Sequence, residues 1–214
     1  MAIHFRERPA AGANPEGLLL LHHGRGADEA DLLGLADVLD PEQRLLVVSP
    51  RAPLTLPGSP GYHWYRVPRV GYPDPASFRE AYSRLAEFHD ETWRRTGVGP
   101  DRTVLGGFSM GTVMSYALGL SGERPVPAGI LAFSGFIPTV EGWHADLASR
   151  PQLPAFIAHG RRDPVIDVAF ARDARDQLQA GGLPVTYLES DGGHSIEPAQ
   201  LPAASSWLGG AIAP

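Results

Sequence analysis

The sequence of 214 residues contains no cysteine and no long apolar run. The first absence excludes disulfide bonds, thiolate metal sites and a cysteine nucleophile. Residues 1–17 (MAIHFRERPAAGANPEG) lack the apolar core of a secretory signal, and the leucine run at 18–21 is far too short to span a bilayer. We therefore expect a cytoplasmic protein without stable membrane insertion.

Positive charge is also scarce. Lys and Arg number 18 against 24 Asp and Glu, the net charge is −6, and the basic residues are scattered. This distribution argues against a surface that binds nucleic acid. The chain is 43% hydrophobic and 20% charged, which is enough to build a core, and its length suits one domain better than two. We predict a single domain over residues 1–214.

Short apolar runs alternate with helical patterns along the chain. The runs with strand character are 17–21, 44–49, 103–108, 129–134, 155–158 and 185–189. The expected helices cover 28–39, 76–95, 110–120 and 167–180, and a last helix carries Trp207. This alternation is typical of an α/β fold in which helices cover both faces of a mostly parallel sheet.

The segment TVLGGFSMG contains a Gly-x-Ser-x-Gly motif, formed by Gly107, Ser109 and Gly111 between an expected strand and an expected helix. In a nucleophile elbow, a serine occupies such a sharp turn at a strained φ/ψ, and glycines let strand and helix pass closely. The pentapeptide alone is weak because the chain has 25 glycines, and a serine that caps a helix N-terminus would also explain it. Other segments of the chain must therefore distinguish a catalytic serine from a serine that caps a helix.

A serine nucleophile needs a histidine to accept its proton and a carboxylate to orient that histidine. Asp163 and His194 each follow an expected strand directly, as Ser109 does, and the order Ser, Asp, His is that of α/β-hydrolases. We predict these three residues as the catalytic set. Asp191, three residues before His194, is the alternative acid, and His159 is interpreted as a packed histidine.

The glycine-rich turn at 22–28 (HHGRGAD) follows the first apolar strand. It lacks the Gly-x-Gly-x-x-Gly spacing and the lysine of phosphate loops, which argues against a nucleotide. Its free backbone N–H groups could instead face an oxyanion, so we predict Arg25 N–H as one donor and Met110 N–H, after the nucleophile, as the other. His22 and His23 border this turn, either orienting it, which we favour, or transferring protons directly.

The long irregular segment 50–75 is expected to help build a substrate pocket. Its aromatic residues Tyr62, Trp64, Tyr65 and Tyr72 either line that pocket or pin the loop to the core. Trp64 and Tyr65, together with His23, are our candidates for substrate binding.

With these residues assembled, the chain resembles the α/β-hydrolase superfamily and, within it, the phospholipase/carboxylesterase family that includes acyl-protein thioesterases and bacterial carboxylesterases. The similarity runs through LLLLHHGRGADEADL, VVSPRAP, WYR, GGFSMG, AFSGF, HGRRDPVI and DGGHSIEP. The resemblance implies an α/β-hydrolase fold with little or no lid domain, a catalytic set of Ser109, Asp163 and His194, and oxyanion donors at Arg25 and Met110. It also implies no metal and no organic cofactor, and dimerisation recurs among family members.

The turn HHGRGADEADL is longer than the His-Gly-Leu-Gly-Asp form usual in acyl-protein thioesterases, so the resemblance is closer to the bacterial esterase branch. We therefore expect a carboxylesterase acting on small-molecule esters of short to medium acyl chain. The alternatives are a lysophospholipase or thioesterase and, from another class, a non-catalytic α/β-hydrolase that binds a ligand.

Overall fold

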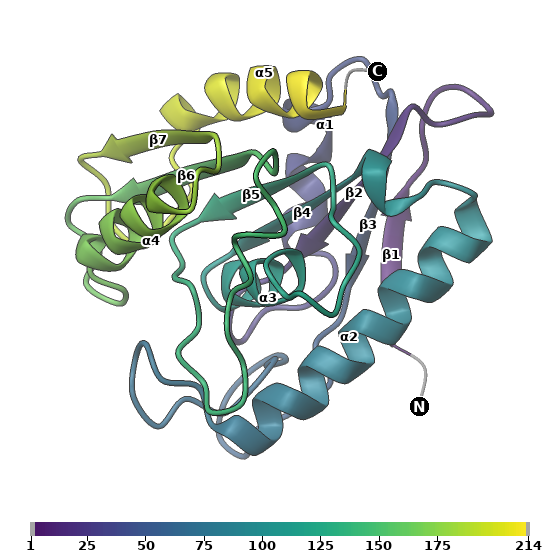
Figure 1. Cartoon of the computed structure of the whole chain (residues 1–214). Coiled ribbons are helices and arrows are strands. Elements are labelled where there is room, and N and C mark those ends of the chain that lie inside the picture. The colour runs from purple at the N-terminus through teal and green to yellow at the C-terminus, as the bar shows by residue number, and fades with distance from the viewer. Residues whose placement is uncertain (1–2, 213–214) are drawn as a thin grey trace.

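The computed structural model describes residues 3–212 and contains a seven-stranded sheet in the order β1-β3-β2-β4-β5-β6-β7 (Figure 1). The strands are β1 (Phe5–Arg8), β2 (Gly17–His22), β3 (Leu45–Pro50), β4 (Thr103–Phe108), β5 (Gly129–Phe133), β6 (Ala155–Gly160) and β7 (Val185–Ser190). Only β1 is antiparallel to its neighbour, pairing Phe5 with Pro50 and Arg8 with Val47. All other pairs in this sheet are parallel.

Helices cover both faces of the sheet, with α2, α3 and α4 on one side and α1 and α5 on the other (Figure 1). They are α1 (Ala36–Leu39), α2 (Pro75–Thr96), α3 (Met110–Gly119), α4 (Val168–Ala180) and α5 (Leu201–Ile212). Along β2, Leu18 and Leu20 pack toward α2 and α3, whereas Leu19 and Leu21 pack toward α1 and α5. Because both faces are buried, the central strands are apolar throughout rather than alternating.

The helix predicted over 76–95 is confirmed as α2, and its local signals explain its ends. The Asp74 side chain accepts a hydrogen bond from Ser77 N–H at 3.0 Å, Pro75 is the first helical residue, and Gly97 ends the helix at φ 69°. An aspartate cap, proline in the first turn and a left-handed glycine are the usual boundaries of a helix.

One prediction about the N-terminal part was wrong. The segment 28–39 is not one helix: it begins with a turn capped by Asp28 and contains a 3₁₀ turn (Leu32–Leu35) before the single turn of α1. Gly34 lies in the middle of this segment, where glycine disfavours a continuous α-helix by about 1 kcal/mol. Residues 5–8, for which no element was predicted, form the edge strand β1, because pairing with β3 overrides the weak apolar pattern of these residues.

The carboxyl ends of the parallel strands lie at one edge of the sheet, which is where sites form in open α/β folds. The irregular segment 51–74 lies at this edge and is held by isolated bridges, among them Ala27 with Tyr62 and Leu54 with His63. Within residues 3–212, no helix is long and apolar enough to cross a membrane.

Candidate active site

Ser109 occupies the turn between β4 and α3 with φ 55° and ψ −117°, a left-handed conformation that costs a non-glycine residue about 1–3 kcal/mol. Its backbone N–H donates to the Phe133 carbonyl at 2.9 Å, which ties the turn to β5. A Cβ on Gly107 would lie 2.5 Å from the carbonyl carbon of Gly111, and one on Gly111 would lie 1.9 Å from the His22 carbonyl oxygen. The glycines of the motif are therefore sterically required.

A hydrogen-bonded chain joins the side chains of Ser109, His194 and Asp163. His194 Nε2 lies 2.9 Å from Ser109 Oγ, and His194 Nδ1 lies 2.7 Å from Asp163 Oδ2. With Nδ1–H donating to the carboxylate, Nε2 is free to accept the serine proton. Ser109 follows β4, Asp163 follows β6 and His194 follows β7, so the parallel strands bring together residues that are far apart in the sequence.

The Asp163 carboxylate is fully buried. Its Oδ1 accepts hydrogen bonds from Val165 N–H at 2.8 Å and Ile166 N–H at 2.9 Å. Burial opposes ionisation, but the hydrogen bonds from His194 and from these two amides outweigh it and hold the pKa of Asp163 below its ordinary value. Asp163 therefore stays an anion beside His194 at neutral pH.

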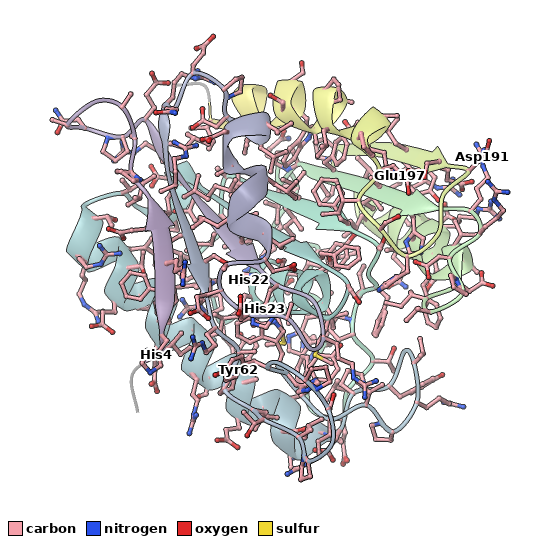
Figure 2. The ribbon with its side chains drawn as sticks, turned by 180° about the vertical axis from the view of Figure 1, so that it is seen from behind. His4, His22, His23, Tyr62, Asp191 and Glu197 are labelled. Atoms are coloured by element: carbon pink, nitrogen blue, oxygen red, sulfur yellow. The ribbon has the colours of Figure 1, made fainter. Side chains whose placement is uncertain are left out.

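Asp191, the alternative acid, points away from this chain. Its side chain is 79% exposed and forms an ion pair with Arg161 at 2.6 Å, and Figure 2 shows it at the outer margin of the molecule. The carboxylate that contacts His194 is that of Asp163.

Arg25 and Met110 line the same cavity as Ser109 and His194. Within residues 3–212, neither amide donates to another group of the protein. Met110 is the first residue of α3, where the helix dipole favours negative charge. The turn that carries Arg25 is fixed by a hydrogen bond from Gly26 N–H to the Tyr62 carbonyl at 2.9 Å. Arg25 and Met110 are therefore retained as the candidate oxyanion donors.

His23 and Trp64 do not line this cavity, which corrects their assignment to substrate binding. Both side chains are buried behind the turn at 22–28. His23 Nε2 accepts from Ala52 N–H at 3.0 Å, so Nδ1 carries the proton that it donates to the Gly24 carbonyl at 2.7 Å. Trp64 Nε1–H donates to the His23 carbonyl at 2.9 Å. These contacts orient the turn, as we favoured for His23.

His22 is likewise buried beside His23 (Figure 2). Its Nδ1 lies 2.8 Å from Ser115 Oγ in α3, and its Nε2 lies 3.1 Å from Nε2 of His89 in α2. Burial, and then the neighbouring His23, lower the pKa of His22 to about 3. His22 is therefore a neutral link between β2 and the helices, and it does not reach the cavity.

The cavity above Ser109 has a volume of about 390 Å³ and a mainly apolar lining. Its lining residues are Gly24, Arg25, Ala27, Asp31, Tyr65, Val67, Arg69, Val70, Pro73, Phe108, Ser109, Met110, Phe136, Val165, Ile166 and His194. Tyr65 is thus the one substrate-binding candidate that lines the cavity.

Segment 50–75 lines the cavity with Tyr65, Val67, Val70 and Pro73, as expected, but the apolar wall opposite the segment was not predicted from the sequence. Val165 and Ile166 closely follow Asp163, and Phe136 lies just past the end of β5. Their positions at strand ends are the signal that could have identified them. Within residues 3–212, no group of three or more His, Cys, Asp or Glu residues is arranged to hold a metal ion.

Comparisons with known proteins agree with this architecture. The family model described as Phospholipase/Carboxylesterase matches residues 9–211. The structure of esterase PE8 is 29% identical, with a TM-score of 0.82 over 97% of this chain and 98% of that one. The Bacillus cereus carboxylesterase is 25% identical, with a TM-score of 0.82 over 98% of this chain and 94% of that one. The predicted α/β-hydrolase fold is thereby confirmed.

Among sequence relatives, Acyl-protein thioesterase 1 of Neurospora crassa is 34% identical over 130 residues. The match covers 58% of this chain and 52% of that protein, so the chain aligns with about half the length of this relative. The match of the family model over almost the whole described chain is more extensive. The chain belongs to the phospholipase/carboxylesterase family of α/β-hydrolases.

Proposed function

We propose that this protein is a serine carboxylesterase that cleaves esters of short to medium acyl chain through an acyl-enzyme intermediate. The observation that carries the proposal is the hydrogen-bonded chain of Ser109, His194 and Asp163 beside two free backbone amides in an apolar cavity. A serine, a histidine and a buried carboxylate in this geometry are the arrangement that activates a hydroxyl at neutral pH.

In the first half of the reaction, Ser109 Oγ attacks the ester carbonyl while His194 Nε2 takes the hydroxyl proton. The carbonyl oxygen becomes an oxyanion, which accepts hydrogen bonds from Arg25 N–H and Met110 N–H. As the tetrahedral intermediate collapses, the bond to the alcohol oxygen breaks, and the proton on His194 passes to the departing alcohol.

In the second half, His194 takes a proton from water, whose oxygen attacks the acyl-enzyme carbonyl. The same amides hold the oxyanion, and the carboxylic acid leaves as the proton returns to Ser109 Oγ. Throughout, the Asp163 carboxylate keeps Nδ1 of His194 protonated and stabilises the imidazolium that forms twice in each cycle.

The mainly apolar lining of the cavity, which has a volume of about 390 Å³, supports an acyl chain as its occupant. The similarity to Acyl-protein thioesterase 1 of N. crassa favours a second candidate, a thioesterase or lysophospholipase. The two candidates differ in the acyl length and leaving group they accept, so substrate profiling separates them.

The test is hydrolysis of p-nitrophenyl esters from C2 to C16 by the wild type and by Ser109→Ala, Asp163→Asn and Asp191→Asn. We expect a maximum at short to medium chains, loss of at least ~10³-fold in Ser109→Ala, and a loss of about 10³–10⁴-fold in Asp163→Asn. Asp191→Asn is the matched control and should retain the wild-type rate, since its carboxylate contacts Arg161 and not His194.

A maximum at long chains would favour the lysophospholipase or thioesterase. Wild-type turnover in Ser109→Ala would contradict the mechanism, and a large loss in Asp191→Asn would contradict the choice of acid. No turnover and no labelling of Ser109 by a fluorophosphonate probe would favour a non-catalytic ligand-binding protein.

A further inference from the structure

His159 is a buried histidine that the reaction above does not use. It lies near the end of β6, four residues before Asp163, and its side chain is fully buried. Its Nε2 lies 2.8 Å from the Ile166 carbonyl oxygen and 3.2 Å from Asp163 Oδ2. A carbonyl oxygen only accepts hydrogen bonds, so Nε2 must carry the proton.

The Nε2–H of His159 therefore donates to the Ile166 carbonyl, and Asp163 Oδ2 lies 3.2 Å from the same nitrogen without a hydrogen bond to it. Asp163 Oδ1 accepts from Val165 N–H and Ile166 N–H, and Oδ2 accepts from His194 Nδ1–H. Ile166 links the ring to this carboxylate, because its carbonyl accepts from His159 and its N–H donates to Asp163 Oδ1. The carboxylate cannot rotate without losing several of these bonds.

The other ring nitrogen, Nδ1, is buried without a hydrogen-bond partner among residues 3–212. Leaving a buried acceptor unpaired costs about 1–3 kcal/mol, so the ring is kept at this cost while its Nε2–H serves the Ile166 carbonyl. The titratable groups that act on His159 are Asp163, His194 and Asp167. Burial lowers the pKa of His159 below its ordinary value, so the ring acts as a neutral donor.

We propose that His159 is a positioning residue: its Nε2–H holds the Ile166 backbone, whose own N–H keeps the Asp163 carboxylate facing His194. The inference rests on the proposed function, because it assigns Asp163 as the acid of that site. It predicts that the N–H group is needed for the full rate although the ring touches no substrate. When a hydrogen bond that orients a reacting group without touching the substrate is removed, activity typically falls by about 10–100-fold.

The variants are His159→Leu, which keeps the volume and removes the donor, and His159→Gln, whose amide N–H can take the place of Nε2–H. His159→Asn is a polar control, because the shorter side chain places its amide where Nδ1 lies in histidine. The amide therefore does not reach the position of Nε2. We expect kcat to fall about 10-fold in His159→Leu and His159→Asn, with KM changed less than about 2-fold. His159→Gln should recover most of the loss.

The pH dependence of kcat/KM distinguishes a positioning role from a packing role, because loss of packing alone would not shift the acid limb of the profile. Without the His159 donor, the Ile166 backbone is held less firmly and its N–H donates less to Asp163 Oδ1. More of the carboxylate charge then acts on the imidazolium of His194, so the acid limb should move to higher pH in His159→Leu and return in His159→Gln. A kcat equal to that of the wild type, together with an unchanged acid limb, in His159→Leu would overturn the proposal. So would equally low activity in His159→Gln and His159→Leu when circular dichroism shows both folded.

A measurement that needs no turnover separates failure of this proposal from failure of the proposed function. The Nδ1 proton of His194 should give a downfield ¹H NMR signal that is absent in His194→Gln. We expect this signal to shift in His159→Leu and to return toward the wild type in His159→Gln, even if no ester is hydrolysed. An unchanged signal in His159→Leu would overturn the positioning role.

Discussion

At the scale of single residues, the steric demand at the serine turn is the most sharply defined feature of the site. Position 111 lies where α3 passes over the end of β2, and a Cβ there would approach the carbonyl oxygens of His22 and His23 at 1.9 and 2.7 Å. Both are backbone atoms, which cannot move aside as a flexible side chain can. Strand β2 and helix α3 can therefore lie this close together only because residue 111 has no Cβ.

We expect Gly111→Ala to lower the free energy of unfolding by about 3 kcal/mol and to reduce ester hydrolysis, because the turn at 22–28 must shift. Gly210→Ala is the matched control. Gly210 lies in α5, and a Cβ at this position would have no atom within 4 Å, so this change should raise stability by up to about 1 kcal/mol. Urea denaturation of both variants checks the pair, and equal stabilities would contradict the steric argument.

At the scale of elements, the segment 51–74 supports the turn that carries Arg25. Trp64 Nε1–H donates to the His23 carbonyl, and the backbone of Tyr62 bonds to Gly26 and Ala27 on the same turn. Neither Trp64 nor Tyr62 lines the cavity. Their contribution is to fix the backbone from which one oxyanion donor is proposed to come.

Trp64→Phe should therefore lower kcat more than it changes KM, because the proposed Arg25 donor acts mainly on the transition state. The lost hydrogen bond should also lower stability by about 1–3 kcal/mol. Trp93→Phe is the matched control: Trp93 Nε1–H donates to Thr103 Oγ1 at 2.9 Å, away from the cavity. Steady-state kinetics on both variants test this prediction. An equal fall in kcat in Trp64→Phe and Trp93→Phe would contradict the supporting role of Trp64.

At the scale of the whole molecule, buried neutral histidines make stability depend on pH. Burial, and then His23, lower the pKa of His22 to about 3, and burial, then His22 and Arg124, lower that of His89 well below its ordinary value. Their Nε2 atoms are 3.1 Å apart, so the pair shares one proton between two nitrogens. A second proton there would have no acceptor.

Between about pH 6.5 and 3 the unfolded chain takes up protons on these histidines while the folded chain does not. Stability is therefore fully present above about pH 6.5 and falls as the pH is lowered, by about 1.4 kcal/mol per pH unit for His22 alone. Urea denaturation at about pH 7.5 and about pH 5 measures this fall. His4→Gln is the control, since His4 lies at the surface (Figure 2), and it should leave the pH dependence unchanged. Equal stability of the wild type at both pH values would contradict the prediction.

The sequence by itself determined the alternation of strands and helices, the Gly-x-Ser-x-Gly turn and the positions of Ser109, Asp163 and His194 at strand ends. These features are local: apolar periodicity, caps and the steric needs of a tight turn act over a few residues. In a parallel sheet, strand ends meet at one edge, so the local pattern was enough to predict that these three side chains come together.

The tertiary structure decided what depends on contacts between distant segments. It placed Asp163 rather than Asp191 beside His194 and buried His23 and Trp64 behind the cavity. It also set the His159 donor against the Ile166 carbonyl, next to the Asp163 carboxylate. A tryptophan or histidine next to a site has the same local pattern whether it faces substrate or supports the backbone. The difference arises only when the loops pack against the sheet, because packing selects which face of each side chain meets the cavity.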